Sequence, residues 1–268
     1  MPPIEKGCNN EVGMCYNKRR KEEMRRTGMD KEHSVLKPSK TVAVIFYVLM
    51  MFLGSSFILI GVVAVYAHLQ PQLSFDALFE ICQKPELLEQ ASDPLIKGYA
   101  MTNAIGNMIS YLLLFAVILF FMRDFLKEDG KRLKKKWRFY LWFIPLCFCL
   151  FYGLSFLFNW LMEKVVSSSE NQQSIELMIE NGGAFYMFIA VVLCAPLVEE
   201  LIYRKAVFSF LERKNILWSY VFSILLFALP HLFTTSFEDP IQWFLKLLPY
   251  LFSALLLALI YHLSGKNI

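Results

Sequence analysis

Long apolar runs constrain this sequence more than any other feature. Thr41–Ala67, Tyr99–Met122 and Phe139–Met162 contain no Asp, Glu, Lys or Arg. Each run exceeds the roughly 20 residues that a helix needs to cross the hydrocarbon layer of a membrane. Because lipid offers the backbone no hydrogen-bond partners, such runs must be helical. A chain that is 56% hydrophobic with several such runs is not a soluble globular domain.

Three further segments complete the predicted bundle. Ala184–Tyr203 is apolar apart from two adjacent glutamates, Ile216–Phe233 contains no Asp, Glu, Lys or Arg, and Ile241–Tyr261 is interrupted by Lys246. The sequence therefore predicts an all-α, polytopic transmembrane helical bundle with about six spanning helices. We expect a multi-pass protein of the cell membrane, with the lipid bilayer as its immediate surroundings.

The charge on the connections predicts the orientation. Residues 1–40 carry ten Lys/Arg against six Asp/Glu, 69–98 carry two against five, and 123–138 carry eight against three. This alternation follows the positive-inside rule and places the N-terminus in the cytoplasm. Residues 1–40 are thus expected to be a flexible, basic cytoplasmic tail, and 41–162 to form three N-terminal transmembrane helices. The basic clusters indicate contact with anionic lipid rather than with nucleic acid.

The fourth span carries ionisable groups deep in an apolar run. A charge at the centre of a membrane helix costs about 2.5–3.5 kcal/mol on insertion scales, so such residues face the bundle interior. Glu200 and Arg204 are four residues apart, which places them on one helix face as a predicted clamp. Glu199 points about 100° away and has no such partner within its helix. It is the predicted free carboxylate and general base.

The fifth span ends in a second polar feature, His231, preceded at four residues by Phe227, whose ring is expected to pack on the imidazole. The turn between the two spans is predicted at Arg213–Asn215. Glu199 precedes Asn215 by 16 residues and His231 follows it by 16. In an antiparallel helix pair both therefore lie at one depth, roughly 24 Å from the turn. There they are expected to hold and activate one water molecule.

A purely structural role is the alternative for each of these residues. The Glu200–Arg204 pair alone is equally consistent with an ion-pair staple, and His231 beside a proline with a satisfied polar contact. Their combination at matched depth favours a functional site. Other intramembrane protease chemistries fit less well, because the sequence has no HExxH motif and no Asp within the predicted spans.

The two patterns, Glu199-Glu200-x-x-x-Arg204 and Phe227-x-x-x-His231, resemble the first two motifs of the CPBP family of intramembrane proteases, also called the Abi or type II CAAX-protease family. The resemblance covers about 184–268, which is the predicted protease core. It implies an endopeptidase acting on a membrane-associated peptide or protein substrate. In that reading Glu199 and His231 activate water, and Glu200, Arg204 and Phe227 support the site. Family members are described as metalloproteases and as glutamate proteases; if a divalent metal such as zinc is used, Glu199 and His231 are its predicted ligands.

One departure bears on activity. The family has a third motif, HxxxN or similar, but His262 is followed at four residues by Lys266 and is not assigned to it. The expectation is a truncated chain or a member with a partial core, and low hydrolysis, because no oxyanion donor is identifiable from the sequence. The main alternative is a non-catalytic membrane binding protein of the bacteriocin-immunity type. A transporter that relays protons through its intramembrane Glu and His ranks third.

Overall fold

The computed structural model describes residues 38–166, 169–232 and 239–266 of the chain. These residues form helices joined by turns and contain no strand, which confirms the predicted all-α class. The predicted flexible tail lies outside the described residues except for its last three positions, which begin the first helix.

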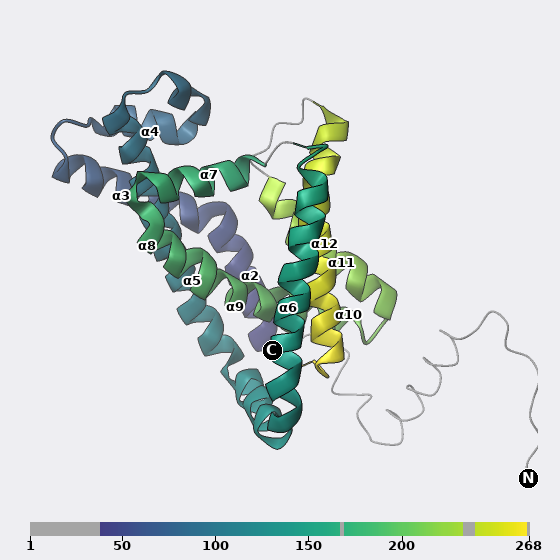
Figure 1. The fold of residues 1–268 in the computed structure, drawn as a ribbon. Helices are drawn as coiled ribbons and strands as arrows, with labels where there is room; N and C mark the ends of the chain where they lie inside the picture. The colour runs from purple at the N-terminus through teal and green to yellow at the C-terminus, as the bar shows by residue number, and fades with distance from the viewer. Residues whose placement is uncertain (1–37, 167–168, 233–238, 267–268) are drawn as a thin grey trace, which may run out of the picture. The chain divides into compact units, whose positions relative to one another are not determined.

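Five of the described helices are long and apolar enough to cross a membrane (Figure 1). They are Pro38–Leu69 (α2 Pro38–Leu49, η1 Met50–Gly54, α3 Ser55–Leu69), α5 Asp93–Lys135, α6 Trp137–Met162, Glu170–Leu211, and α12 Pro240–Leu263. A shorter apolar helix, Ile216–Leu232, comprises α11 (Ile216–Ala228) and the 3₁₀ turn η6 (Leu229–Leu232) and is the predicted fifth span.

The predicted connections contain more helix than expected. The expected loop at 123–138 is instead the continuation of α5, which ends at Lys135, with Lys136 as the turn before α6. Lysine and arginine are good helix formers, so a basic run continues a helix that has already begun. The connection at 69–98 holds α4 (Phe75–Gln83) and η2 (Pro85–Gln90). The side of the membrane on which the N-terminus lies stays a prediction.

The fourth span is wound irregularly. It runs through α7 (Glu170–Met178), η3 (Ile179–Gly183), α8 (Ala184–Met187), η4 (Phe188–Cys194), α9 (Ala195–Glu199), η5 (Glu200–Phe208) and α10 (Ser209–Leu211). The segments η4 and η5 are π-helical and flank the short α-helical turn that carries Pro196. Proline removes a backbone hydrogen bond, and π-helical turns are frequent at functional sites. The two adjacent glutamates lie where α9 gives way to η5.

The main buried cluster joins most of the spans. Tyr47 of α2, Leu114 of α5, Leu201 of η5, Phe227 of α11 and Ala254 of α12 all belong to it. In contrast, within α6, all of which the structure describes, Tyr140 is the one buried residue. Figure 1 shows α6 beside α12, with which it is in contact. The remaining surface of α6 is therefore available to lipid and to the cavity described below.

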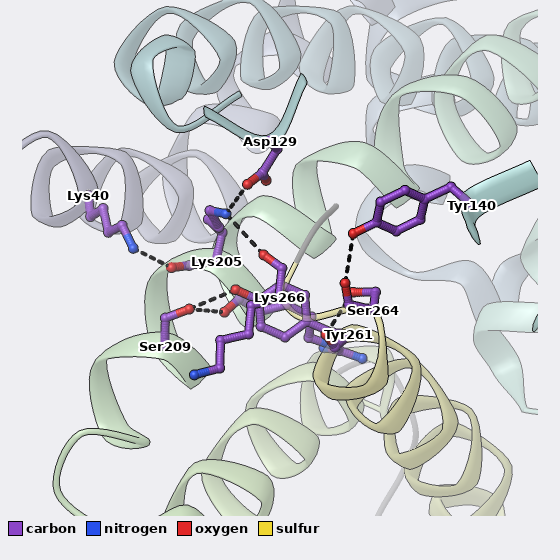
Figure 2. A network of polar contacts seen from close by, with 9 residues as sticks. Lys40, Asp129, Tyr140, Lys205, Ser209, Tyr261, Ser264 and Lys266 are labelled. Atoms are coloured by element: carbon purple, nitrogen blue, oxygen red, sulfur yellow. Dashed lines mark hydrogen bonds and ion pairs between the residues drawn. The ribbon is translucent and has the colours of Figure 1, made fainter. Parts of the chain in front are cut away.

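A polar network joins six elements at one end of the bundle (Figure 2). The Lys205 ammonium of η5 donates to Asp129 of α5 at 2.5 Å and to the Lys266 carbonyl at 3.2 Å. Lys40 of α2 donates to the Lys205 carbonyl at 2.6 Å. Lys205 and Asp129 are both buried. Because Asp129 lies beyond the predicted end of the second span, sequence reasoning did not include it in the bundle.

The same network holds the end of α12. The Tyr140 hydroxyl of α6 donates to the Ser264 carbonyl at 2.8 Å, and the Tyr261 and Ser209 hydroxyls are 2.8 Å apart. Side chains from α6 and α10 thus fix the last turn of α12 (Figure 2).

Removing the carboxylate of this network is expected to destabilise the fold. Breaking a buried ion pair from one side costs about 3–5 kcal/mol, because the other charge is left uncompensated. Asp129→Asn should therefore lower the free energy of unfolding by about that amount, measured by denaturation in mixed detergent micelles. Asp124→Asn is the matched control, since Asp124 forms an exposed pair with Lys127 on the same helix. An equal loss for the two variants would contradict the structural role of Asp129.

Candidate functional site

The fourth and fifth spans deliver the two predicted reactive groups to one cavity. The turn between the two spans includes the predicted Arg213–Asn215, since α10 ends at Leu211 and α11 begins at Ile216. The Asn215 side chain caps α11 by accepting the Leu217 N–H at 2.8 Å. A cavity of about 720 Å³ is lined by Glu199, Glu200 and His231 together with residues of α2, α5, α6, α7 and α12.

A backbone hydrogen bond fixes which ring nitrogen of His231 carries the hydrogen. Its Nδ1 lies 2.9 Å from the Phe227 carbonyl. A carbonyl oxygen only accepts, so Nδ1 carries the hydrogen and the Nε2 lone pair remains available. The Phe227 ring lies 5.2 Å from the imidazole, as the spacing predicted, and the Tyr250 ring stacks on it at 4.5 Å. His231 can therefore accept a hydrogen bond, or a proton, through Nε2.

The Glu200–Arg204 pair predicted from the spacing is present. The Arg204 guanidinium is fully buried, and its Nε lies 3.5 Å from Glu200 Oε1. Its Nη2 donates to the Ala254 carbonyl of α12 at 3.1 Å. The guanidinium also lies over the Phe227 ring, 5.0 Å from its centroid. Phe227 therefore contacts both Arg204 and His231, which gives a physical reason for an aromatic residue at this position.

Tyrosines complete the surroundings of Glu199, and sequence reasoning missed them. Tyr111 of α5 lines the cavity together with Glu199. Tyr47 of α2 lines the same cavity and shares a 2.9 Å hydrogen bond with Tyr203. The spacing predicts no ion-pair partner for Glu199 within its own helix. No oxyanion donor was identifiable from the sequence, whereas the structure places two tyrosines, Tyr111 and Tyr47, in the cavity wall.

The described side chains do not supply a complete zinc site. A catalytic zinc is held by about three protein ligands. Within 38–166, 169–232 and 239–266, no group of three or more His, Cys, Asp or Glu side chains is gathered in a way that could hold a metal ion. Glu199 and His231 would provide two ligands, and Glu200 is engaged with Arg204. The chemistry derived from this geometry is therefore that of Glu199 and His231 themselves.

His262 lies apart from this site. It occupies the last turn of α12, with its ring 6.5 Å from that of Phe208 and 6.2 Å from that of Tyr220. It is not among the residues that line the cavity. This placement agrees with leaving His262 out of the predicted site.

Comparison with known proteins gives a match to the part of the chain that contains the candidate site residues. Residues 181–268 match the family model described as type II CAAX prenyl endopeptidase Rce1-like. The matched segment contains all five predicted site residues, so the resemblance drawn from the two motifs is confirmed over this segment. No curated protein and no solved structure matches the chain.

The two adjacent glutamates are expected to differ in what their loss does to the fold. Glu200→Ala leaves the buried Arg204 without its carboxylate, which should lower the unfolding free energy by about 3–5 kcal/mol. Glu199→Gln keeps the shape of the side chain and leaves the Glu200–Arg204 pair in place, so its effect should be smaller. Thermal unfolding of the purified variants in detergent measures both. A larger loss for Glu199→Gln would refute the clamp role of Glu200.

Proposed function

We propose that this chain is an intramembrane endopeptidase that hydrolyses a peptide bond of a membrane-associated substrate with water activated by Glu199 and His231. The observation that carries the proposal is that both groups line one cavity. Both residues also belong to the segment that matches the endopeptidase family. A carboxylate and a neutral imidazole with its Nε2 free are suited to general acid–base chemistry on water.

The reaction follows from these two groups. A water molecule held between them donates one hydrogen bond to the Glu199 carboxylate and another to His231 Nε2. Glu199 takes a proton as the water oxygen bonds to the carbonyl carbon of the substrate. The resulting tetrahedral intermediate collapses when Glu199 gives that proton to the amide nitrogen, and the C–N bond breaks. A carboxylic acid, which keeps the second proton of the water, and a neutral amine leave, and the ionised Glu199 is restored.

Tyr111 is the proposed oxyanion donor. The tetrahedral intermediate carries a negative oxygen, and loss of one such donor typically costs about 100- to 1000-fold in rate. Tyr111 lines the cavity together with Glu199 and His231. From this wall its O–H can donate to the oxyanion of an intermediate formed beside Glu199.

The cavity wall suits a substrate with an apolar anchor. One side of α6 lines it with mostly aromatic and aliphatic side chains, namely Tyr140, Phe143, Ile144, Cys147, Phe148, Phe151 and Tyr152. An apolar wall within the membrane accommodates a peptide carrying a lipid or an apolar tail, since the tail exchanges lipid contacts for van der Waals packing on the wall. A prenylated CAAX peptide, as in the name of the matched family, is therefore the substrate class to test first.

A non-catalytic membrane binding protein is the second candidate. The placement of His262 outside the cavity favours it, because the family's third motif would add a histidine to the site. In that case the same cavity holds a peptide and does not cleave it.

Cleavage of a prenylated peptide in proteoliposomes tests the proposal. The wild-type chain should cut the peptide, and Glu199→Gln and His231→Asn should each lower kcat by about 100-fold or more, since general acid–base groups contribute 10²–10⁴-fold. Glu176→Gln, on the exposed face of α7, is the matched control and should leave the rate unchanged. Equal cleavage by Glu199→Gln would contradict the proposal, and binding without cleavage by the wild type would favour the second candidate.

A further inference from the structure

Tyr250 of α12 contacts the candidate catalytic histidine. The rings of Tyr250 and His231 are stacked, with centroids 4.5 Å apart and planes 30° apart. Tyr250 is not among the residues that line the cavity. It therefore contacts the imidazole without facing the position proposed for substrate.

The hydroxyl of Tyr250 is fixed by the start of α7. It lies 2.7 Å from the Ser169 hydroxyl and accepts a hydrogen bond from Asn171 Nδ2 at 3.4 Å. Ser169 is buried and caps α7 by accepting the Gln172 N–H at 3.3 Å. The tether of Tyr250 is thus part of the helix cap and not a flexible surface contact.

A second contact joins the same two helices. Lys246 precedes Tyr250 by one helical turn on α12, and its ammonium lies 3.0 Å from the Glu170 carboxylate. Two neighbouring turns of α12 are therefore connected to the first residues of α7. Figure 1 shows α7 extending from the region of α8 toward α12.

We infer that Tyr250 is a positioning residue for His231, and that the start of α7 fixes Tyr250 in turn. The inference rests on the proposed function, since it concerns how the reactive imidazole is held. The stacked ring restricts rotation of the imidazole, which keeps Nδ1 on the Phe227 carbonyl and leaves Nε2 free. If the ring turned over about its Cβ–Cγ bond, Cδ2 would take the place of Nδ1 and Cε1 that of Nε2, so the hydrogen bond to the Phe227 carbonyl would be lost and the Nε2 lone pair would leave its position.

The inference also extends the site along the chain. Residues 169–171 precede the segment that matches the endopeptidase family, which begins at 181. They act on His231 through Tyr250, so the sequence before the matched segment contributes to the geometry of the site. Asn171 additionally lines the cavity.

Histidine tautomers, read by ¹⁵N NMR, test this directly and need no substrate. The chain has four histidines, so uniform ¹⁵N labelling of histidine in the full chain gives few signals, and His231→Asn identifies the one of interest. The wild type should show His231 with the hydrogen on Nδ1. Tyr250→Leu removes the stacked ring and should give a mixture of both tautomers. Tyr250→Phe keeps the ring but loses its tether to α7, so it should give a smaller share of the second tautomer, and an unchanged signal would contradict the role of α7. Ser169→Ala should resemble Tyr250→Phe.

Phe252→Leu is the matched control. Phe252 lies on the same helix but stacks on Phe158 of α6, with centroids 4.4 Å apart. This variant should leave the His231 signal unchanged even if it lowers stability. An unchanged tautomer in Tyr250→Leu, or an equal change in Phe252→Leu, would overturn the inference.

Peptide cleavage by the same variants provides the second readout. Misplacing a catalytic group by about 1 Å can cost on the order of 100-fold, so Tyr250→Leu should lower kcat by about 10- to 100-fold with little change in KM. Tyr250→Phe should recover most of that loss. If KM rises and kcat holds, Tyr250 does not position the histidine. If the wild type cleaves nothing, the proposed function fails, and the tautomer in Tyr250→Leu still decides the role of Tyr250.

Discussion

The buried guanidinium of Arg204 is the interaction on which the arrangement of the site depends. A charge within an apolar span must find partners inside the bundle, because lipid provides none. Arg204 forms an ion pair with the Glu200 carboxylate, donates from Nη2 to the Ala254 carbonyl and lies over the Phe227 ring. These partners come from the fourth span, from α12 and from α11. One cation therefore holds together the helices that carry Glu199 and His231.

The site is built outward from that contact. Phe227 contacts the guanidinium, packs on the His231 ring and provides the carbonyl that holds its Nδ1. Glu199 directly precedes Glu200 of the clamp and lines the cavity together with it and with Tyr111. Glu200 is engaged by Arg204, which leaves the proton-accepting role to Glu199.

Sequence alone could predict the parts of this fold that depend on local periodicity. Uncharged runs gave the spans, and the four-residue spacing gave the Glu200–Arg204 pair and the packing of Phe227 on His231. Equal spacing about Asn215 placed Glu199 and His231 at one depth, and both line one cavity. Contacts between residues on different helices follow no fixed spacing in the sequence, so they could not be predicted in this way. Tyr111 and Tyr250 read as ordinary aromatic residues of apolar spans, and the Asp129–Lys205 pair was missed because α5 continues through a segment whose charges suggested a loop.

The separation of the two reactive groups tests the central claim most directly. An experimental structure of the full chain in a lipid nanodisc would give the distance between the Glu199 carboxylate and His231 Nε2. Shared activation of one water predicts direct or one-water reach, about 3–6 Å, with both groups facing the cavity. A separation beyond about 10 Å, with either side chain facing lipid, exceeds what one water can bridge and would contradict a common site.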